Sequence, residues 1–189
     1  LTQNIQGSAV VVVSAMGKTT NELENVHGVL TKEGIVSAQS QMNAIIDAHE
    51  AIARELGIHV DLRVIFESAL KTANELEDID ARYDALVAAG EDASTRVLSG
   101  YLKMKNFDAK WSDARDIILT DSKHRSARVD ERNIYESGTG LRKALSEMEN
   151  RIIVTQGFIG RCPSGKTTTL GREGSDYSAA LLACAIGAK

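Results

Sequence analysis

The chain has 189 residues, a formal net charge of −4 and a pI near 5.6. This length can bury a sizeable core, and the composition, 43% hydrophobic and 25% charged, is typical of a globular protein. The charge balance offers no basic field for nucleic acid, and no apolar run approaches a membrane span. The start shows no signal-peptide pattern, and the two cysteines have neither metal nor redox spacing. We therefore expect a cytoplasmic protein without nucleic-acid or membrane partners.

Strand and helix patterns alternate along the chain. The β-branched run at 9–13 is typical of a strand buried on both faces of a parallel sheet. Helical spacing then predicts three helices, over residues 35–56, 62–76 and 79–101, the last interrupted at Gly90. The later patterns predict a strand and its exit (109–119), a loop (121–137), a helix (141–148), a strand (151–154), a hairpin (159–168) and a helix from about Ser175 to Gly187. This order predicts an α/β fold with a mainly parallel sheet flanked by helices and a helical insertion between the first strands.

The most informative stretch is residues 154–176, which has the pattern of an anion site. An apolar strand ends at a glycine, a hairpin follows, and Gly171, Gly174 and Ser175 then deliver the backbone to a helix start. Unpaired N–H groups and the helix dipole favour phosphate or carboxylate at such a position. Arg172 can pair with a carboxylate through two N–H groups, and Asp176 can cap the helix or hold a cation or an ammonium group.

The same stretch fits the Walker A expression G-x-x-x-x-G-K-[ST] at residues 160–167. A phosphate loop places its lysine at the first turn of a long helix, but Lys166 is followed by three threonines and a glycine-broken loop. We therefore interpret 163–165 as a hairpin turn. A P-loop nucleotide hydrolase remains the alternative, and it requires a helix that starts at Lys166.

Two further segments carry candidate residues. Residues 14–21 follow the carboxyl end of a buried strand, where open α/β sheets place ligands, and offer N–H and O–H donors to an anion; an ordinary turn with an Asn cap is the alternative. Glu91 lies in a tract of small residues and can meet a substrate ammonium while an arginine holds the carboxylate; a surface helix position is the alternative. No histidine has ligand spacing, so no metal site is predicted. Salt-bridged or solvated side chains explain the weaker candidates Asp113, Arg115, Arg125 and Arg128.

These motifs together resemble the aspartate kinases of the amino-acid kinase superfamily over nearly the whole chain. The matching segments are VVVSAMGKTTN (11–21), LVAAGE (86–91), WSDAR (111–115), TQGFIG (155–160) and TTTLGREGSDY (167–177). The resemblance implies a substrate site lined by Ser14, Thr20, Glu91, Phe158, Thr169, Arg172 and Ser175. It also implies phosphate binding at Gly171 and Gly174, and a catalytic role for Asp176.

The activity implied by the resemblance is transfer of the γ-phosphoryl group of ATP, with Mg²⁺, to the side-chain carboxylate of L-aspartate. The product, 4-phospho-L-aspartate, is the first intermediate on the way to lysine, threonine and methionine. The resemblance further implies a homo-oligomer in the full-length protein. The alternatives within the superfamily are kinases of glutamate, acetylglutamate or UMP, and a non-catalytic folding or dimerisation scaffold is a third possibility.

The chain departs from the family pattern in two ways. Glu173 stands where many members have glycine, and we expect its side chain to point outward. The family's N-terminal Lys-Phe/Tyr-Gly-Gly-Thr-Ser segment, with its phosphate-binding lysine, is missing, as are the nucleotide-binding and regulatory ACT regions. We therefore expect residues 1–189 to be a partial amino-acid kinase catalytic domain, mostly the substrate-binding lobe, cut from a longer protein and inactive by itself.

Overall fold

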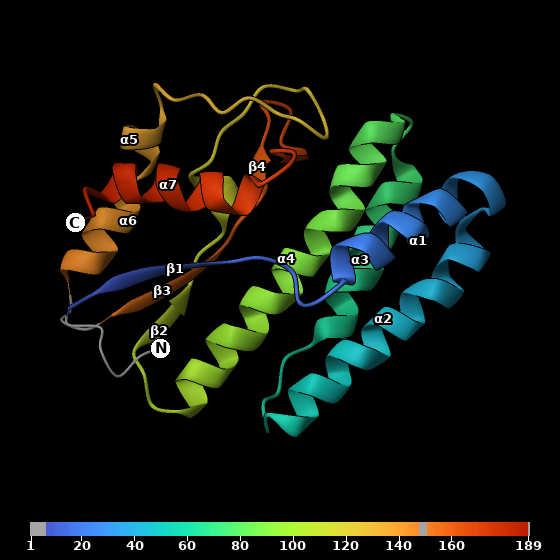
Figure 1. Ribbon diagram of the computed structural model, residues 1–189, viewed down its shortest axis with the longest axis horizontal. Helices are drawn as coiled ribbons and strands as arrows, with labels where there is room; N and C mark the ends of the chain where they lie inside the picture. The colour runs from blue at the N-terminus through green and yellow to red at the C-terminus, as the bar shows by residue number, and fades with distance from the viewer. Residues whose placement is uncertain (1–6, 148–150, 189) are drawn as a thin grey trace.

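Three parallel strands form the centre of the molecule, in the order β1–β3–β2 (Figure 1). The computed structural model describes residues 7–147 and 151–188. Strand β3 (Ile152–Gln156) is buried throughout and pairs with β1 (Ala9–Val13) on one side and β2 (Ala109–Trp111) on the other. Val154 of β3 lies in register with both Val11 and Trp111. β-branched side chains suit a strand in this position because they pack well on a pleated surface that is covered from both sides.

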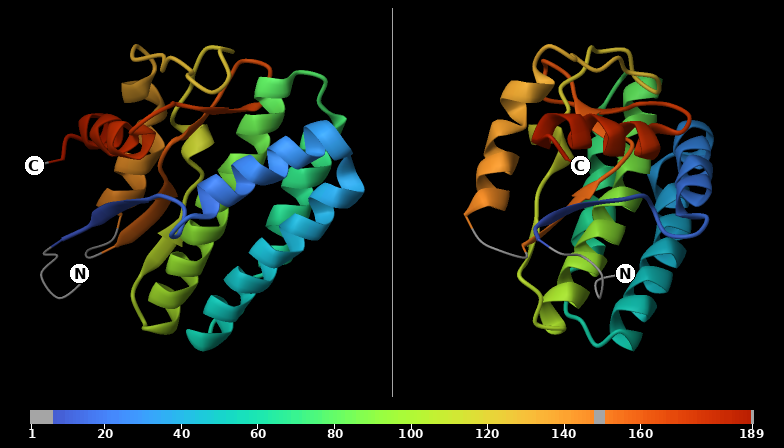
Figure 2. Two further views of the ribbon diagram at one scale, coloured as in Figure 1. Left: turned by 45° about the vertical axis from the view of Figure 1, so that its right-hand side comes forward. Right: turned by 60° about the vertical axis from the view of Figure 1, so that its left-hand side comes forward.

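Four long helices form a layer beside the sheet (Figures 1 and 2). They are α1 (Thr19–Glu33), α2 (Ile35–Glu55), α3 (Leu62–Glu75) and α4 (Ile79–Met104). Each presents an apolar stripe to a shared core, in which Leu23, Met42, Phe66 and Leu86 are fully buried. Helix α4 packs against α1 and α3 and also against all three strands, so it joins the helical layer to the sheet.

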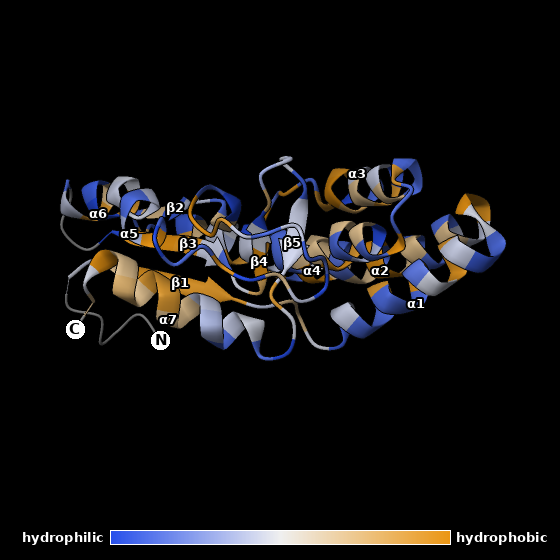
Figure 3. Cartoon of the chain, turned by 90° about the horizontal axis from the view of Figure 1, so that it is seen from above, coloured by the Kyte–Doolittle hydropathy of each residue, from blue (hydrophilic) through white to orange (hydrophobic). Residues whose placement is uncertain are grey.

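The C-terminal part of the chain builds a second core. It contains β4 (Ile159–Arg161), β5 (Thr167–Thr169) and three helices, α5 (Ile134–Ser137), α6 (Thr139–Ser146) and α7 (Gly174–Ile186). Strands β4 and β5 are antiparallel, with Ile159 opposite Thr169. Helix α7 packs against β1, and Figure 3 shows the hydrophobic part of this helix beside the equally hydrophobic strand. Ile118, Ile153, Ile159 and Leu182 are the large, fully buried side chains of this core.

The structure confirms the predicted α/β class, the helical insertion between the first strands and the hairpin. Strand β1 is half-buried along its length, not buried on both faces as its β-branched run predicted. The prediction for helix 79–101 was wrong in one respect, because α4 runs through Gly90 without interruption. A Cβ atom at Gly90 would lie 2.9 Å from Ala15 Cβ and 3.3 Å from Thr19 Cγ2. The glycine therefore lets α4 approach the end of β1 closely rather than breaking the helix.

Helix α1 was not predicted, although it begins within the segment 14–21 that we treated as a ligand loop. Its start at Thr19 is held by Thr19 N–H and Oγ1–H, both of which donate to Met16 O. Leu23, Val26 and Leu30 form its buried stripe. The segment is thus a turn that leads directly into a helix, and Ser14 and Thr20 lie on either side of the helix start.

The P-loop alternative is contradicted by the backbone around Lys166. This residue lies in the turn between β4 and β5, where Gly165 has φ +83° and Gly165 N–H donates to Cys162 O. The next helix, α7, begins only at Gly174. Two other details differ from the sequence patterns: residues 121–137 include the short helix α5, and a 3-10 helix at Ala114–Asp116 follows β2. The predicted helix end at residue 148 lies outside the described residues.

In the described part of the chain, no helix combines the length and the apolar character needed to cross a membrane.

Candidate functional site

The predicted site residues come together around one cavity of about 600 Å³. All of them except Thr169 line it, and they arrive from distant parts of the sequence. Ser14 follows the carboxyl end of β1, Phe158 follows the carboxyl end of β3, and Glu91 lies on α4. Residues 171–176 form the loop before α7 and the start of that helix. Parallel sheets place ligands at this edge, outside the carboxyl ends of their strands. Three residues that the sequence analysis did not assign to the site also line the cavity: Glu24, Tyr83 and Arg125.

Two glycines allow the start of α7 to touch the end of β3. A Cβ atom at Gly157 would lie 2.7 Å from Ser175 Cβ, and one at Gly174 would lie 2.7 Å from Phe158 Cδ2. Phe158 itself has φ 67°, and its N–H donates to Ser178 Oγ of α7 at 2.9 Å. The close packing brings the first turn of α7 to the edge of the cavity, and larger side chains at either glycine would force the two segments apart.

The N-terminus of α7 is open to an anion. No side chain caps it, and the residue in the cap position, Glu173, has left-handed backbone angles (φ 59°, ψ 21°). Gly174 N–H donates to Gly171 O at 3.1 Å, so the N–H groups of Ser175 and Asp176 and the positive end of the helix dipole remain for a phosphate or a carboxylate. Asp176 lies in this first turn and is exposed. Glu173 is also exposed, as expected, but it still lines the cavity, so its charge is part of the site.

Glu91 is the most unusual group in the cavity. It is buried, with only 2% of its surface exposed, which contradicts the surface alternative for this residue. Its Oε1 accepts from Ala15 N–H at 3.2 Å, whereas Oε2 has no hydrogen-bond partner in the described part of the chain. Burial raises the pKa of Glu91 to about 7. An unpaired buried oxygen is unfavourable, so its place in a cavity wall points to a ligand that donates hydrogen bonds there.

Four charged residues line the cavity in addition to Glu24 and Glu91. Glu173 and Asp176 are acidic, whereas Arg125 and Arg172 are basic. Arg172 is exposed and makes no hydrogen bond or ion pair with another described residue, so its guanidinium group is available to a ligand. The cavity therefore offers a buried carboxylate to a cation and two guanidinium groups to anions. This combination suits a small zwitterion with more than one acidic group.

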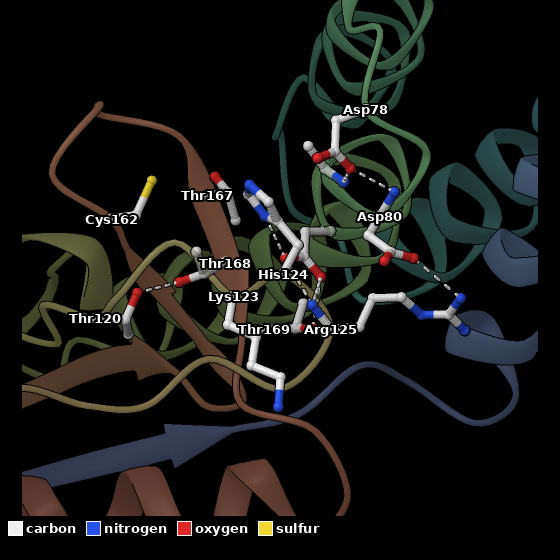
Figure 4. A network of polar contacts seen from close by, with 12 residues as sticks. Asp78, Asp80, Thr120, Lys123, His124, Arg125, Cys162, Thr167, Thr168 and Thr169 are labelled. Carbon is white, nitrogen blue, oxygen red and sulfur yellow. Dashed lines mark hydrogen bonds and ion pairs between the residues drawn. The ribbon is translucent and has the colours of Figure 1, made fainter.

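Thr169 lies behind the cavity wall rather than in it. Its side chain is fully buried and donates to Asp84 Oδ1 at 2.6 Å. Asp84 also accepts from Arg125 N–H and lies 2.7 Å, through Oδ2, from His124 Nδ1 (Figure 4 shows His124, Arg125 and Thr169). The sequence analysis missed Asp84, although a signal was present: Asp84 precedes Glu91 by seven residues, which places both carboxylates on one face of α4.

A second network of charges is satisfied internally. Arg115 donates to both oxygens of Asp92, at 3.0 and 2.7 Å, and to Asp113 and Thr167. Burial alone would lower the pKa of Arg115, but Asp92 and Asp113 raise it above its ordinary value. Gln156 Nε2 donates to Asp92 at 2.6 Å. This network fastens the turn of α4 that carries Glu91 to β3 and to the exit of β2. It agrees with the expectation that Asp113 and Arg115 are salt-bridged.

Comparisons with known proteins agree with this geometry. Residues 2–189 match the model of the amino acid kinase family. The chain is 36% identical to an aspartokinase of Chlamydia trachomatis over 173 residues, and 33% identical to lysine-sensitive aspartokinase 3 of Escherichia coli over 187 residues. These alignments cover 91% and 95% of the chain but 38% and 40% of the relatives.

One solved structure that resembles the chain is E. coli aspartokinase III in complex with aspartate and ADP, with a TM-score of 0.81 and 32% identity. The match covers 98% of this chain and 41% of that protein. The chain thus spans about two fifths of the length of these relatives. By the family match, by these relatives and by the arrangement of the sheet and its cavity, the chain belongs to the amino acid kinase family.

Proposed function

We propose that this chain carries the acceptor site of an aspartate kinase, which transfers the γ-phosphoryl group of ATP to the side-chain carboxylate of L-aspartate. The observation that carries the proposal is the unpaired Oε2 of Glu91 in a cavity that also contains Arg172. An α-amino acid provides an ammonium group for Oε2 of Glu91 and a carboxylate for the guanidinium group of Arg172. The names of the aspartokinase relatives support the choice of aspartate.

The roles of the other residues follow from charge and position. Arg172 pairs with the α-carboxylate of aspartate, and the hydroxyl groups of Ser14 and Thr20 steady the side-chain carboxylate at the carboxyl end of β1. N–H groups of residues 171–175 stabilise the negative charge that develops during transfer. Phosphoryl transfer needs positioning and charge neutralisation more than covalent help from the protein, and a cavity with fixed donors provides both.

ATP and Mg²⁺ are the cofactors implied by the family. The open N-terminus of α7 fits a phosphate group, and Asp176 in its first turn fits a role in organising the transfer centre. No cluster of three or more metal-ligating side chains exists within residues 7–147 and 151–188. Mg²⁺ needs no such cluster, because it is usually bound by one or two carboxylates together with phosphates and water. When bound, Mg²⁺ neutralises the charge of the transferring phosphates. A homo-oligomer and a cytoplasmic location are part of the same proposal.

Calorimetric titration with related ligands tests the acceptor assignment. We expect saturable binding of L-aspartate, and weaker binding of two analogues that each lack one group. Succinate lacks the ammonium that Glu91 holds, and β-alanine lacks the α-carboxylate that Arg172 holds. L-Glutamate separates aspartate kinases from glutamate kinases. Equal affinity for aspartate and succinate would contradict the role of Glu91, and tighter binding of glutamate would favour the sister enzyme.

The transfer step is tested with the protein that carries this chain, MgATP and hydroxylamine. Hydroxylamine converts an acyl phosphate into a hydroxamate, so aspartate-dependent hydroxamate is the expected product. If that protein releases ADP without forming hydroxamate, the acceptor is not a carboxylate and the proposal fails.

A further inference from the structure

Arg125 is the other guanidinium group of the cavity, and its backbone is held in an unfavourable conformation. Its φ is 64°, in the left-handed region that favours glycine and that costs an arginine about 1 kcal/mol or more. Strain of this kind persists only where the surroundings enforce it. The position of Arg125 is therefore fixed by particular contacts, which the structure identifies.

The buried carboxylate of Asp84 supplies these contacts. Arg125 N–H lies 3.0 Å from Asp84 Oδ1 and 3.1 Å from Oδ2, and His124 Nδ1 lies 2.7 Å from Oδ2. Ala127 N–H donates to Thr169 O at 2.9 Å, two residues before the anion loop begins at Gly171. Asp84 is fully buried on α4, so the segment with Arg125 is fixed to the same helix that presents Glu91. Asp84 thus fixes the backbone of Arg125 to α4, the helix that also carries Glu91.

The side chain of Arg125 is held loosely by comparison. Its guanidinium carbon lies 4.1 Å from the centre of the Tyr83 ring, and Nη1 lies 3.4 Å from Asp80 Oδ1 (Figure 4). About half of both side chains in this ion pair is exposed (50% and 56%), and such pairs contribute little. Stacking on Tyr83 uses the face of the guanidinium plane and leaves in-plane N–H donors free. Arg125 can therefore exchange Asp80 for an anionic ligand in the cavity.

We propose that Arg125 is a second acceptor-binding residue, which holds the carboxylate that Arg172 does not hold. The inference rests on the proposed function and extends it, because in a cavity with four acidic side chains an acceptor with two carboxylates is better neutralised by two guanidinium groups than by one. Arg125 then makes the site selective for dicarboxylic amino acids over their amides.

Arg125→Gly is a suitable test because it removes the guanidinium group and relieves the backbone strain at the same time. We expect the variant to fold at least as stably as the parent chain, in urea unfolding, and to bind L-aspartate about tenfold more weakly in calorimetric titration. The preference for L-aspartate over L-asparagine should fall by a similar factor. Arg125→Lys retains the charge without the fork and should lose less affinity.

Arg128→Ala is the matched control. Arg128 is an exposed arginine of the same segment that does not line the cavity, and its substitution removes the same charge. We expect its affinity for L-aspartate to equal that of the parent. Unchanged affinity and selectivity in Arg125→Gly, or an equal loss in Arg128→Ala, would overturn the inference and leave the proposed function standing. Absence of saturable aspartate binding by the parent chain would overturn both.

Discussion

The two buried carboxylates of α4 have opposite surroundings. Asp84 and Glu91 lie seven residues apart on one face of the helix, and both are almost completely buried, with 0% and 2% of their surface exposed. Asp84 has three polar partners, namely the side chains of Thr169 and His124 and the backbone N–H of Arg125. Glu91 has one partner, Ala15 N–H, and an oxygen without any within the described residues.

The difference separates a structural acid from a ligand-binding one. Burial raises the pKa of both carboxyl groups, and at Asp84 hydrogen bonds from Thr169, Arg125 and His124 oppose this effect. A fully bonded buried acid joins segments of the fold, whereas an unpaired one lowers stability until a ligand arrives.

Substitution of Asp84 should produce the largest loss of stability. Asp84→Ala leaves a small cavity and leaves its three polar partners without a hydrogen-bond acceptor. We therefore expect the free energy of unfolding in urea to fall by about 3–5 kcal/mol. Asp84→Asn preserves the volume and part of the bonding, and its loss should be smaller. A loss below about 1 kcal/mol in the alanine variant would show that the network is not structural.

Substitution of Glu91 should raise the free energy of unfolding at alkaline pH, whereas substitution of Asp84 lowers it. The folded-state pKa of about 7 exceeds the ordinary value of 4.5, so stability of the parent chain falls as the pH rises from 4.5 to 7. This shift corresponds to a cost of about 3 kcal/mol above pH 7. Glu91→Gln removes the charge but keeps an unpaired amide, so we expect a net gain of about 1–2 kcal/mol at pH 8.

The gain in Glu91→Gln should largely vanish at pH 5, where the parent carboxyl group is already protonated in the folded state. Urea unfolding at the two pH values measures the difference. The same variant should bind L-aspartate at least about thirtyfold more weakly at pH 8, because the partner of the ammonium group is lost. A variant less stable than the parent at pH 8 would place Glu91 with Asp84 as a structural acid.

Glu173 differs from both buried acids: it is exposed, and it destabilises the fold through its backbone conformation rather than through its charge. Its φ of 59° is unfavourable for any residue except glycine, so Glu173→Gly should raise the free energy of unfolding by about 1 kcal/mol. Gly171→Ala is the reverse control, because it adds a side chain at a left-handed position instead of removing one. It introduces a side chain at φ +78° and 3.3 Å from Arg125 O, and it should destabilise by a similar amount. Equal stability of Glu173→Gly and the parent would show that the loop is not strained there.

The sequence patterns predicted those features of the fold that depend on neighbouring residues in the chain. The β-branched run correctly indicated strand β1, although this strand is half-buried rather than buried on both faces, and the glycines at 171 and 174 mark the start of α7. Ser14, Phe158 and the 171–176 loop, which the family motifs assign to one site, line one cavity. These features depend on residues close together in sequence.

The features that the sequence did not reveal depend on distant partners. Gly90 was interpreted as a helix break because its neighbours, on α1 and in the turn after β1, lie some seventy residues away, and only their close approach explains the glycine. Arg125 has left-handed angles that no local motif indicates, because its N–H is held by Asp84, 41 residues earlier. The same holds for the orphan oxygen of Glu91, since burial and missing partners are properties of the assembled fold.

Proton release on ligand binding tests whether Oε2 of Glu91 binds the ammonium group of L-aspartate. Because the pKa of Glu91 is raised to about 7, part of its carboxyl groups is protonated at pH 7, and an ammonium group at Oε2 should ionise them. Calorimetric titration of L-aspartate at pH 7, in buffers with different ionisation enthalpies, should therefore show release of a fraction of a proton per ligand, and Glu91→Gln should abolish this release. Saturable aspartate binding without proton release, or with the same release in Glu91→Gln, would contradict the account.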